Sequence, residues 1–286
     1  MTSRPRFQIR TGLGRALDVE HRSNRFVLAA AVAAGAGTLL FRWATEADDV
    51  WLWAFRAGAA VFLAWAIGRE LDPDDTASAG VAAVLVIPLL ALGAPSLASA
   101  GAVLVAARIA VRTTGVSAHW IDGIVLTAAA AYLGSQAETW PALGTLILAL
   151  GTDRYAEPPG ADRTLVFAAM MGVAAFVTAF WVADTLEWTQ PTVAEWIVVG
   201  VVAAGGFLAI VNTQTPTSRA DLHPGDLSET RLRFGRMLGL FTLVVGLIYV
   251  GGPSVTGLTP LWAALLATAA LHYFRTYRSR TAQPPM

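Results

Sequence analysis

Long blocks of apolar residues restrict this chain more than any other feature of its sequence. The stretches 26–44 and 50–68 are each 19 residues long with a single internal Arg, and 164–183 and 193–213 are about as long and as apolar. Because an α-helix rises about 1.5 Å per residue, each block matches a hydrocarbon core about 30 Å thick. Helices that are apolar on every side belong in lipid or in a core larger than 286 residues can build. The sequence therefore predicts an all-α, polytopic integral membrane protein that crosses the cell membrane several times.

The composition agrees with this class of protein. Charged residues make up 14% of the chain, against about 25% in an average soluble protein. The sequence has no Cys and no Lys, which excludes disulfides, Cys-based zinc sites, Schiff-base chemistry and a P-loop lysine. Its net charge is zero, so it lacks the basic excess typical of nucleic-acid binding. We expect membrane lipids as partners, no nucleic acid and no cofactor, and the sequence gives no indication of the oligomeric state.

Ten apolar segments qualify as candidate spans, and we predict between eight and ten transmembrane helices. The pairs within 78–111 and 121–152 share only 34 and 32 residues, so their helices lie near the lower length limit for crossing. Either these helices cross nearly upright in a thinned bilayer, or one pair is re-entrant and returns to the same side. The ten segments are 26–44, 50–68, 78–94, 96–111, 121–136, 140–152, 164–185, 193–213, 234–251 and 258–274.

The arginines indicate which side of the membrane each loop faces. With ten spans and both termini in the cytoplasm, 18 of the 20 Arg lie inside, and only Arg42 and Arg56 lie outside. Eight of the ten Trp fall near the outer ends of their spans, at the interface that indole rings favour. We therefore predict cytoplasmic N- and C-termini. The predicted organisation is a cytoplasmic segment 1–25 with a possible interfacial helix, a transmembrane domain 26–274 and a cytoplasmic tail 275–286.

Charged residues that could do chemistry are concentrated in four predicted cytoplasmic loops. The loops 68–77, 112–122, 152–163 and 213–236 each contain Arg and Asp. Folded together, they would form a pocket in which Arg holds an anion and Asp serves as a metal ligand or base. The simpler interpretation is that Arg follows the positive-inside rule while Asp, Ser and Thr cap helices. The candidate polar cluster at the cytoplasmic face is Arg69, Asp72, Arg108, Arg112, Asp122, Asp153 and Arg154.

Two details of these loops go beyond the simpler interpretation. Arg108 lies a full turn inside the membrane from Arg112, and a buried Arg needs a partner, for which Asp122 at the start of the next span is the natural candidate. The loop GRELDPDDTA (68–77) holds four acids where Arg should predominate. One carboxylate or hydroxyl, from Asp75, Thr76 or Ser78, suffices to cap the following helix. The remaining acids are a surplus that points to the cytoplasmic face as the place to look for a site.

Known catalytic signatures are absent from the sequence, which contains no HExxH, GxSxG or GxxxxGK[ST] pattern. We therefore expect a carrier or channel-like protein for a small or lipidic solute. A carrier predicts a polar cavity that reaches the midplane between the short helices, and a solid, dry bundle there would count against it. The alternative is a membrane enzyme acting on a phosphorylated or prenylated lipid at the cytoplasmic face, for which Asp72, Asp122 and Asp153 would have to share a metal cluster. A structural or assembly subunit is the third possibility. Length and span number are similar to those of ten-helix drug/metabolite transporters, although no residue motif carries that similarity.

Overall fold

The computed structural model describes residues 11–14, 17–181, 188–221 and 225–281, and side chains as far as Arg275. Within these residues the fold is all-α, without a strand, as the apolar blocks predict. Five of the described helices, α1, α2, α7, α8 and α9, are long and apolar enough to cross a membrane. The α-helices are α1 (Arg22–Ala44), α2 (Val50–Leu71), α3 (Thr76–Leu89), α4 (Leu97–Val111), α5 (Trp120–Gly134), α6 (Trp140–Asp153), α7 (Arg163–Trp181), α8 (Val193–Val211), α9 (Glu229–Tyr249), α10 (Gly252–Gly257) and α11 (Thr259–Thr281).

Each of the ten predicted segments corresponds to one helix of 14 residues or more, and side-chain caps mark the starts of α3 and α9. Asp75 accepts a hydrogen bond from the backbone N–H of Ala77 (2.8 Å) and starts α3. Ser228 accepts one from Arg231 N (3.4 Å) and starts α9. The short helix α10 was not predicted, because residues 251–257, GGPSVTG, indicate a break between two spans rather than a helix of six residues.

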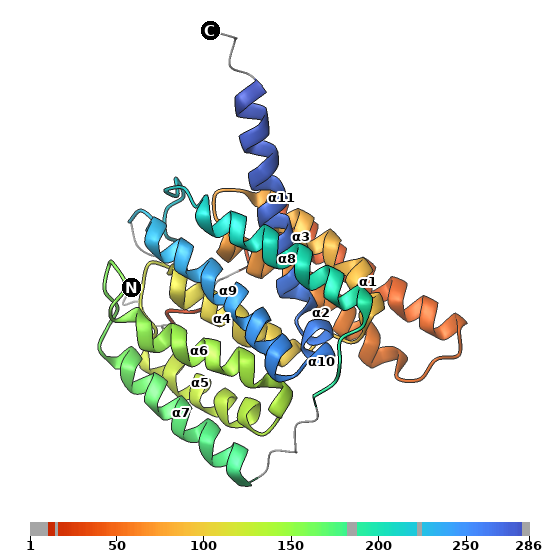
Figure 1. Cartoon of the computed structure of the whole chain (residues 1–286), viewed down its shortest axis with the longest axis horizontal. Helices are drawn as coiled ribbons and strands as arrows, with labels where there is room; N and C mark the ends of the chain where they lie inside the picture. Colours follow the sequence, from red (N-terminus) through yellow and green to blue (C-terminus); the bar gives the residue numbers. More distant parts are fainter. Residues whose placement is uncertain (1–10, 15–16, 182–187, 222–224, 282–286) are drawn as a thin grey trace, which may run out of the picture.

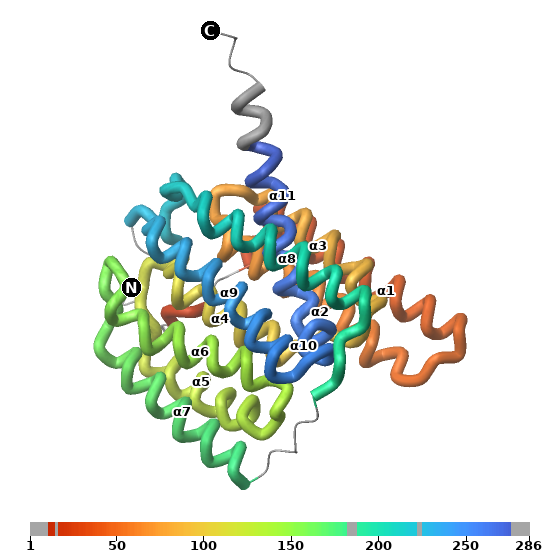
Figure 2. The backbone as a smooth tube through the Cα atoms, viewed as in Figure 1, coloured from red at the N-terminus to blue at the C-terminus, as the bar shows by residue number. Residues whose placement is uncertain are grey.

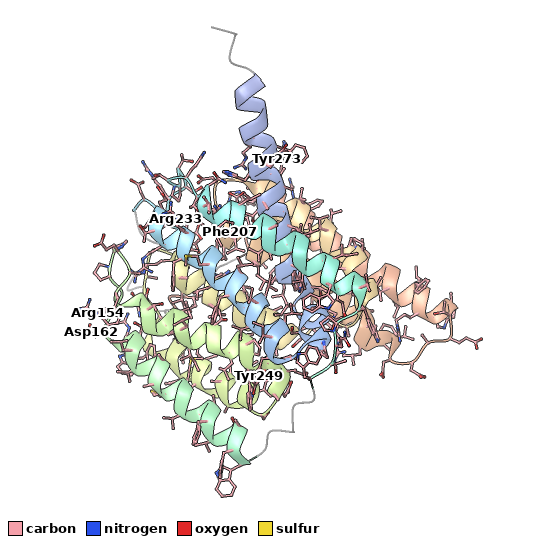
Figure 3. The ribbon with its side chains drawn as sticks, viewed as in Figure 1. Arg154, Asp162, Phe207, Arg233, Tyr249 and Tyr273 are labelled. Atoms are coloured by element: carbon pink, nitrogen blue, oxygen red, sulfur yellow. The ribbon has the colours of Figure 1, made fainter. Side chains whose placement is uncertain are left out.

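The helices run back and forth between two ends of the bundle (Figure 1). One end, which we call the inner face, carries the α2–α3, α4–α5, α6–α7 and α8–α9 connections together with residues 11–14 and 17–21. These connections touch one another: Asp221 N donates to Thr113 O (3.0 Å), and Ala161 N donates to Ser117 Oγ (3.2 Å). Figure 3 shows Arg154, Asp162 and Arg233 at this end and Tyr249 at the opposite end, the outer face.

The short helices α3 to α6 extend to the same outer face as the longer α9. Trp140, at the start of α6, stacks on Tyr249 at the end of α9, with ring centroids 5.8 Å apart. Ser96, which caps α4, donates its backbone N–H to Gly257 O of α10 (3.0 Å). A re-entrant pair would end well before the outer end of α9, so this geometry favours the interpretation that the short helices cross upright.

Two groups of helices are joined through α4 and α9 (Figure 2). In one group α2 packs against α1, α3 and α11; in the other, α5, α6 and α7 pack together. Small residues permit these close contacts, as predicted. A Cβ on Gly68 of α2 would lie 3.1 Å from Ala79 Cα of α3, and one on Gly134 of α5 would lie 2.8 Å from Ala175 Cα of α7. Gly134 therefore leaves no room for a side chain, and Gly68 leaves little.

The described part of the N-terminal segment differs from the expected interfacial helix. Residues 11–14 and 17–21 are irregular chain that lies against the inner face, and α1 begins only at Arg22. Gly12 N donates to Asp122 and Leu13 O accepts from Arg108 of the bundle. Leu13 N and Gly14 N donate to the Thr11 hydroxyl, so these backbone groups are satisfied without a helix. The rest of the segment, residues 1–10 and 15–16, lies outside the described residues.

Candidate ligand cavity at the inner face

The half-buried Arg108 of α4 pairs with Glu70 of α2. Its Nε donates to Glu70 Oε1 (2.8 Å), and its Nη1 donates to Leu13 O (2.7 Å) of the N-terminal segment. Glu70 is fully buried, and its second oxygen accepts from the hydroxyl of Thr113. The predicted Arg108–Asp122 pair is wrong, because α4 packs against α2, α6 and α9 and not against the following helix.

Asp122 has a different structural role, at the start of α5. It accepts hydrogen bonds from the backbone N–H of His119 (2.7 Å) and of Gly12 (2.8 Å), and from the Thr11 hydroxyl. Thr114 donates to Gly12 O (2.7 Å) from the other side. Asp122 thus caps α5 and attaches the N-terminal segment to the α4–α5 connection.

Asp153 is the centre of a second buried cluster. Its Oδ1 accepts from Arg112 Nη2 (2.7 Å) and from Arg231 Nη1 (3.0 Å), which joins the inner ends of α4, α6 and α9. Arg231 is only 1% exposed and donates further to the carbonyl oxygens of Ala156 and Pro158. Arg112 and Asp153 belong to the cluster that the sequence predicts. Arg231 does not, because nothing in the sequence distinguishes Arg231 from the other arginines of the predicted cytoplasmic loops.

The acidic surplus of the 68–77 loop is explained by structural contacts. Asp74 accepts from the backbone N–H of Thr217 (2.9 Å) and of Ser218 (2.8 Å), which ties the α2–α3 loop to the α8–α9 loop. Asp75 caps α3 and pairs with Arg275 of α11, which also lies 3.9 Å from Asp72. With Glu70 on Arg108, every acid of the loop has a partner.

Burial and hydrogen bonding shift the pKa values of two of these carboxyl groups in opposite directions. Burial raises the pKa of Asp72, although Arg236 and Arg275 oppose it. Burial acts in the same direction on Asp74, but the hydrogen bonds from Ser218 and Thr217 outweigh it, and the pKa of Asp74 lies below its usual value. Asp74 is therefore firmly ionised where it holds the two loops together.

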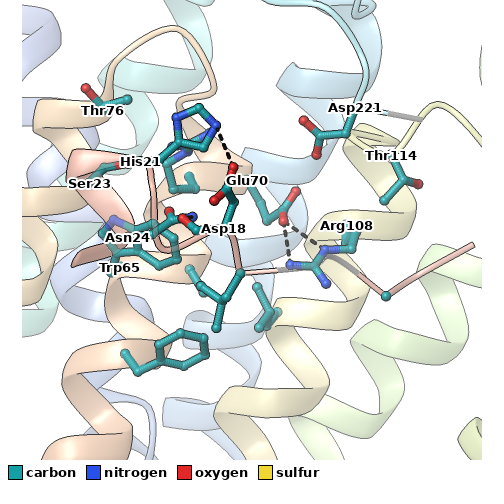
Figure 4. A pocket seen from close by; sticks show the side chains of 16 residues that line it. Asp18, His21, Ser23, Asn24, Trp65, Glu70, Thr76, Arg108, Thr114 and Asp221 are labelled. Carbon is teal, nitrogen blue, oxygen red and sulfur yellow. Dashed lines mark hydrogen bonds and ion pairs between the residues drawn. The ribbon is translucent and has the colours of Figure 1, made fainter. Parts of the chain in front are cut away.

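A cavity of about 700 Å³ opens at the inner face between the N-terminal segment, α1, α2 and α4 (Figure 4). Its charged and aromatic lining includes three pairs of neighbouring residues: Arg108 with Glu70, Asp18 with His21 (3.5 Å), and Arg69 with Trp65. The guanidinium carbon of Arg69 lies 5.8 Å from the centre of the Trp65 ring, a cation–π arrangement. The described lining is completed by Gly14, Leu17, Ser23, Asn24, Phe62, Ala66, Thr76, Leu104, Thr114 and Asp221.

The seven predicted cluster residues are thus divided among several places on the inner face. Arg69 and Arg108 line the cavity, whereas Arg112 and Asp153 belong to the buried cluster with Arg231. Asp72 lies beside Arg275, and Asp122 holds the N-terminal segment. Arg154 forms an exposed pair with Asp162 at the edge of the inner face (Figure 3).

The expectation of a polar cavity between the short helices is not met. The space lined by Val103, Ala106, Thr145, Gly239 and Leu261 has no room for a water molecule, because Ala and Gly let the helices close on one another. Among the described residues, no three His, Asp or Glu side chains come together as a metal site, so Asp72, Asp122 and Asp153 do not share one.

The class of this protein follows from its geometry, because no comparison with known proteins gives a match. No protein family matches the chain, and neither any curated protein nor any solved structure is similar enough to count as a match. What fold and cavity define together is a helical protein with several membrane-length apolar helices and one ligand-sized cavity among the polar contacts of its inner face.

Proposed function

We propose that this chain is a multi-pass carrier of the cell membrane that takes up a lipidic solute into the inner-face cavity. The observation that carries the proposal is the cavity itself. Its volume of about 700 Å³ falls within the ~300–1,000 Å³ of small-molecule sites, and it combines a charged mouth with apolar walls from Phe62 and Leu104.

The proposal includes ten spans with both termini in the cytoplasm. The inner face gathers the four loops in which the arginines are concentrated, and the short helices reach the outer face beside Tyr249 and Gly257. Five of the described helices have the length and hydropathy of spans by themselves. The shorter ones would cross beside them, with a slightly thinner bilayer around α3 to α6.

The closed space between the helices at the midplane favours a carrier over an open channel. The space lined by Thr145 and Gly239 between the helices has no room for a water molecule. The dry midplane counts against the cavity that a carrier predicts there, so the proposal assigns this structure to an inward-open state, from which release to the other side requires the helices to move. A channel would need a continuous polar path in at least one state.

Transport by the purified chain in liposomes tests this proposal. Fluorescent phospholipid analogues placed in the inner leaflet are made accessible to an external quencher only if the protein moves them across. We expect Leu104→Trp, which fills the cavity, to reduce that rate at least tenfold. Leu208→Trp makes the same change at a position on α8 that is 55% exposed, and it should leave the rate unchanged. Equal rates in liposomes with and without protein would refute the carrier.

A membrane enzyme acting on a lipid headgroup at the same cavity is the second candidate. It is favoured by the carboxylates of Asp18, Glu70 and Asp221, each of which could act as a base toward a bound headgroup. The two candidates differ in outcome, because an enzyme changes the mass of the lipid and a carrier changes only its leaflet. Mass spectrometry of the lipids recovered from the same liposomes distinguishes them.

A further inference from the structure

We infer that the ligand of the inner-face cavity is an amphiphile whose headgroup carries both an anionic and a cationic group. This inference rests on the proposed function, and it concerns only which solute binds. The first reason is the charge of the lining. Among the described residues, the three carboxylates of Asp18, Glu70 and Asp221 face the two guanidinium groups of Arg69 and Arg108.

That balance disfavours a polyanionic headgroup such as a diphosphate. Such sites are built with an excess of Arg or with a metal ion, since the ligand charge must be neutralised where water is partly excluded. The Arg108–Glu70 pair is already internally neutral, and its guanidinium is further occupied by Leu13 O.

Donors for the anionic group lie together on one face of α2. The side chain of Trp65 is 7% exposed, and its Nε1–H has no acceptor among the described residues. A buried N–H without an acceptor is costly, so a ligand oxygen at this position would be stabilising. Arg69 is one turn further along the same helix, beside the Trp65 ring, and supplies the positive charge.

Acceptors for the cationic group lie at the mouth of the cavity. Asp18 comes from the N-terminal segment and Asp221 from the α8–α9 loop, and Figure 4 shows them on opposite sides of the Glu70 and Arg108 side chains. The Asp18 side chain is 51% exposed, with Oδ1 accepting from Glu20 N (2.8 Å) and Oδ2 lying 3.5 Å from His21 Nε2. An ammonium group at the mouth would meet this carboxylate without removing it from water.

The position of the apolar lining indicates an amphiphile rather than a free headgroup. Phe62 precedes Arg69 by seven residues on α2, which places it about 10 Å deeper at helical rise. Leu104 lies one turn deeper than Arg108 on α4. The cavity is therefore polar at the inner end and apolar toward the membrane interior, the same polarity order as a lipid of the cytoplasmic leaflet.

Native mass spectrometry of the purified full-length chain tests the inference. The protein is titrated with phosphatidylethanolamine, phosphatidylglycerol and phosphatidic acid of identical acyl chains. We expect phosphatidylethanolamine to bind at least tenfold more tightly than either anionic lipid. Glycerophosphoethanolamine, the same headgroup without chains, should bind at least tenfold more weakly; equal binding would show a soluble zwitterion as the ligand and would overturn the amphiphile. Tighter binding of either anionic lipid would overturn the zwitterionic headgroup.

Two variants with matched controls locate the binding. Trp65→Phe removes the buried N–H and should weaken phosphatidylethanolamine binding about tenfold. Trp262→Phe removes an equally unpartnered and buried N–H on α11, outside the cavity, and should have no effect. Asp18→Asn should abolish the preference over phosphatidylglycerol, whereas the exposed Asp162→Asn should not. Equal effects of a variant and its control would place the lipid elsewhere.

These measurements separate the inference from the proposed function. Selective binding without lipid movement in liposomes would retain the site and refute the carrier. Lipid movement without headgroup selectivity would retain the carrier and refute the inference.

Discussion

The inner face and the interior of the bundle are held together by different kinds of contact. At the inner face, buried Arg and acidic side chains join elements far apart in the sequence, as Asp153 does for Arg112 and Arg231. In the interior, small and apolar residues such as Ala106 and Gly239 pack until no space for water remains. The cost of a charge is highest at the bilayer midplane and falls toward the headgroups. The chain therefore places its specific polar contacts, and its cavity, at one end.

The largest loss of stability is expected when Asp153 of the inner face is replaced. Asp153→Asn leaves the buried guanidinium groups of Arg112 and Arg231 without a counter-charge, and we expect a loss of about 3–5 kcal/mol in the free energy of unfolding. Thermal unfolding in detergent measures it. Asp162→Asn breaks an exposed pair with Arg154 and should cost less than about 1 kcal/mol. Equal losses in both variants would contradict the importance of burial.

The next largest effect is expected at Glu70. Glu70→Gln removes the charge from the Arg108 pair but keeps a hydrogen-bonding group of the same size, so we expect a loss of about 1.5–3 kcal/mol. Arg108 keeps Leu13 O and lies at the edge of the cavity, where water can reach it. The same unfolding experiment measures the loss, and a cost above that of Asp153→Asn would reverse the proposed order of the two clusters.

A smaller loss of stability is expected when the contact between Thr145 and Thr242 in the interior is broken. Thr145 Oγ1 and Thr242 Oγ1 lie 2.7 Å apart in the closed region between α6 and α9. Each hydroxyl also contacts a backbone carbonyl of its own helix, Pro141 O and Leu238 O. Thr242→Val should therefore cost only about 0.6 kcal/mol, the average for hydrogen bonds between membrane helices. A loss as large as that of Glu70→Gln would show that polar contacts stabilise the interior as they do the inner face.

The sequence predicts the interior better than the inner face, for a physical reason. Helix positions follow from apolar length, and the starts of α3 and α9 follow from Asp75 and Ser228, which act within one turn. The partner of Arg108 depends on which helices are neighbours, and α4 lies beside α2 rather than beside the helix that follows it. Long-range packing of this kind leaves no local pattern in the sequence.

The N-terminal segment illustrates the same limit. Its Leu13 and neighbouring residues favour an interfacial helix when considered alone, yet Gly12 and Leu13 bond to Asp122 and Arg108 of the bundle. The seven candidate residues all lie toward the inner face, but only Arg69 and Arg108 line the cavity. The cavity lining also includes Asp18, which only the folded segment brings there.

The stability of the inner face should also depend weakly on pH. The pKa of Asp74 lies below its usual value of 3.8, because the ionised carboxylate accepts hydrogen bonds from Thr217 and Ser218. A carboxyl group with a lowered pKa in the folded state contributes stability above its unfolded pKa, and that contribution disappears as the pH falls through the folded value. Asp74→Asn should thus lower stability by less than about 1 kcal/mol at pH 7, since the group is exposed. The difference from the wild type should persist down to about pH 4 and vanish below it.

Asp72 provides the opposite sign: burial raises its pKa, so Asp72→Asn should lose less stability at pH 7 than Asp74→Asn, and its deficit should grow rather than vanish as acid protonates the wild-type group. Unfolding curves of the three proteins between pH 3 and pH 7 measure both trends, and parallel curves for the two variants would show that the loop acids are equivalent.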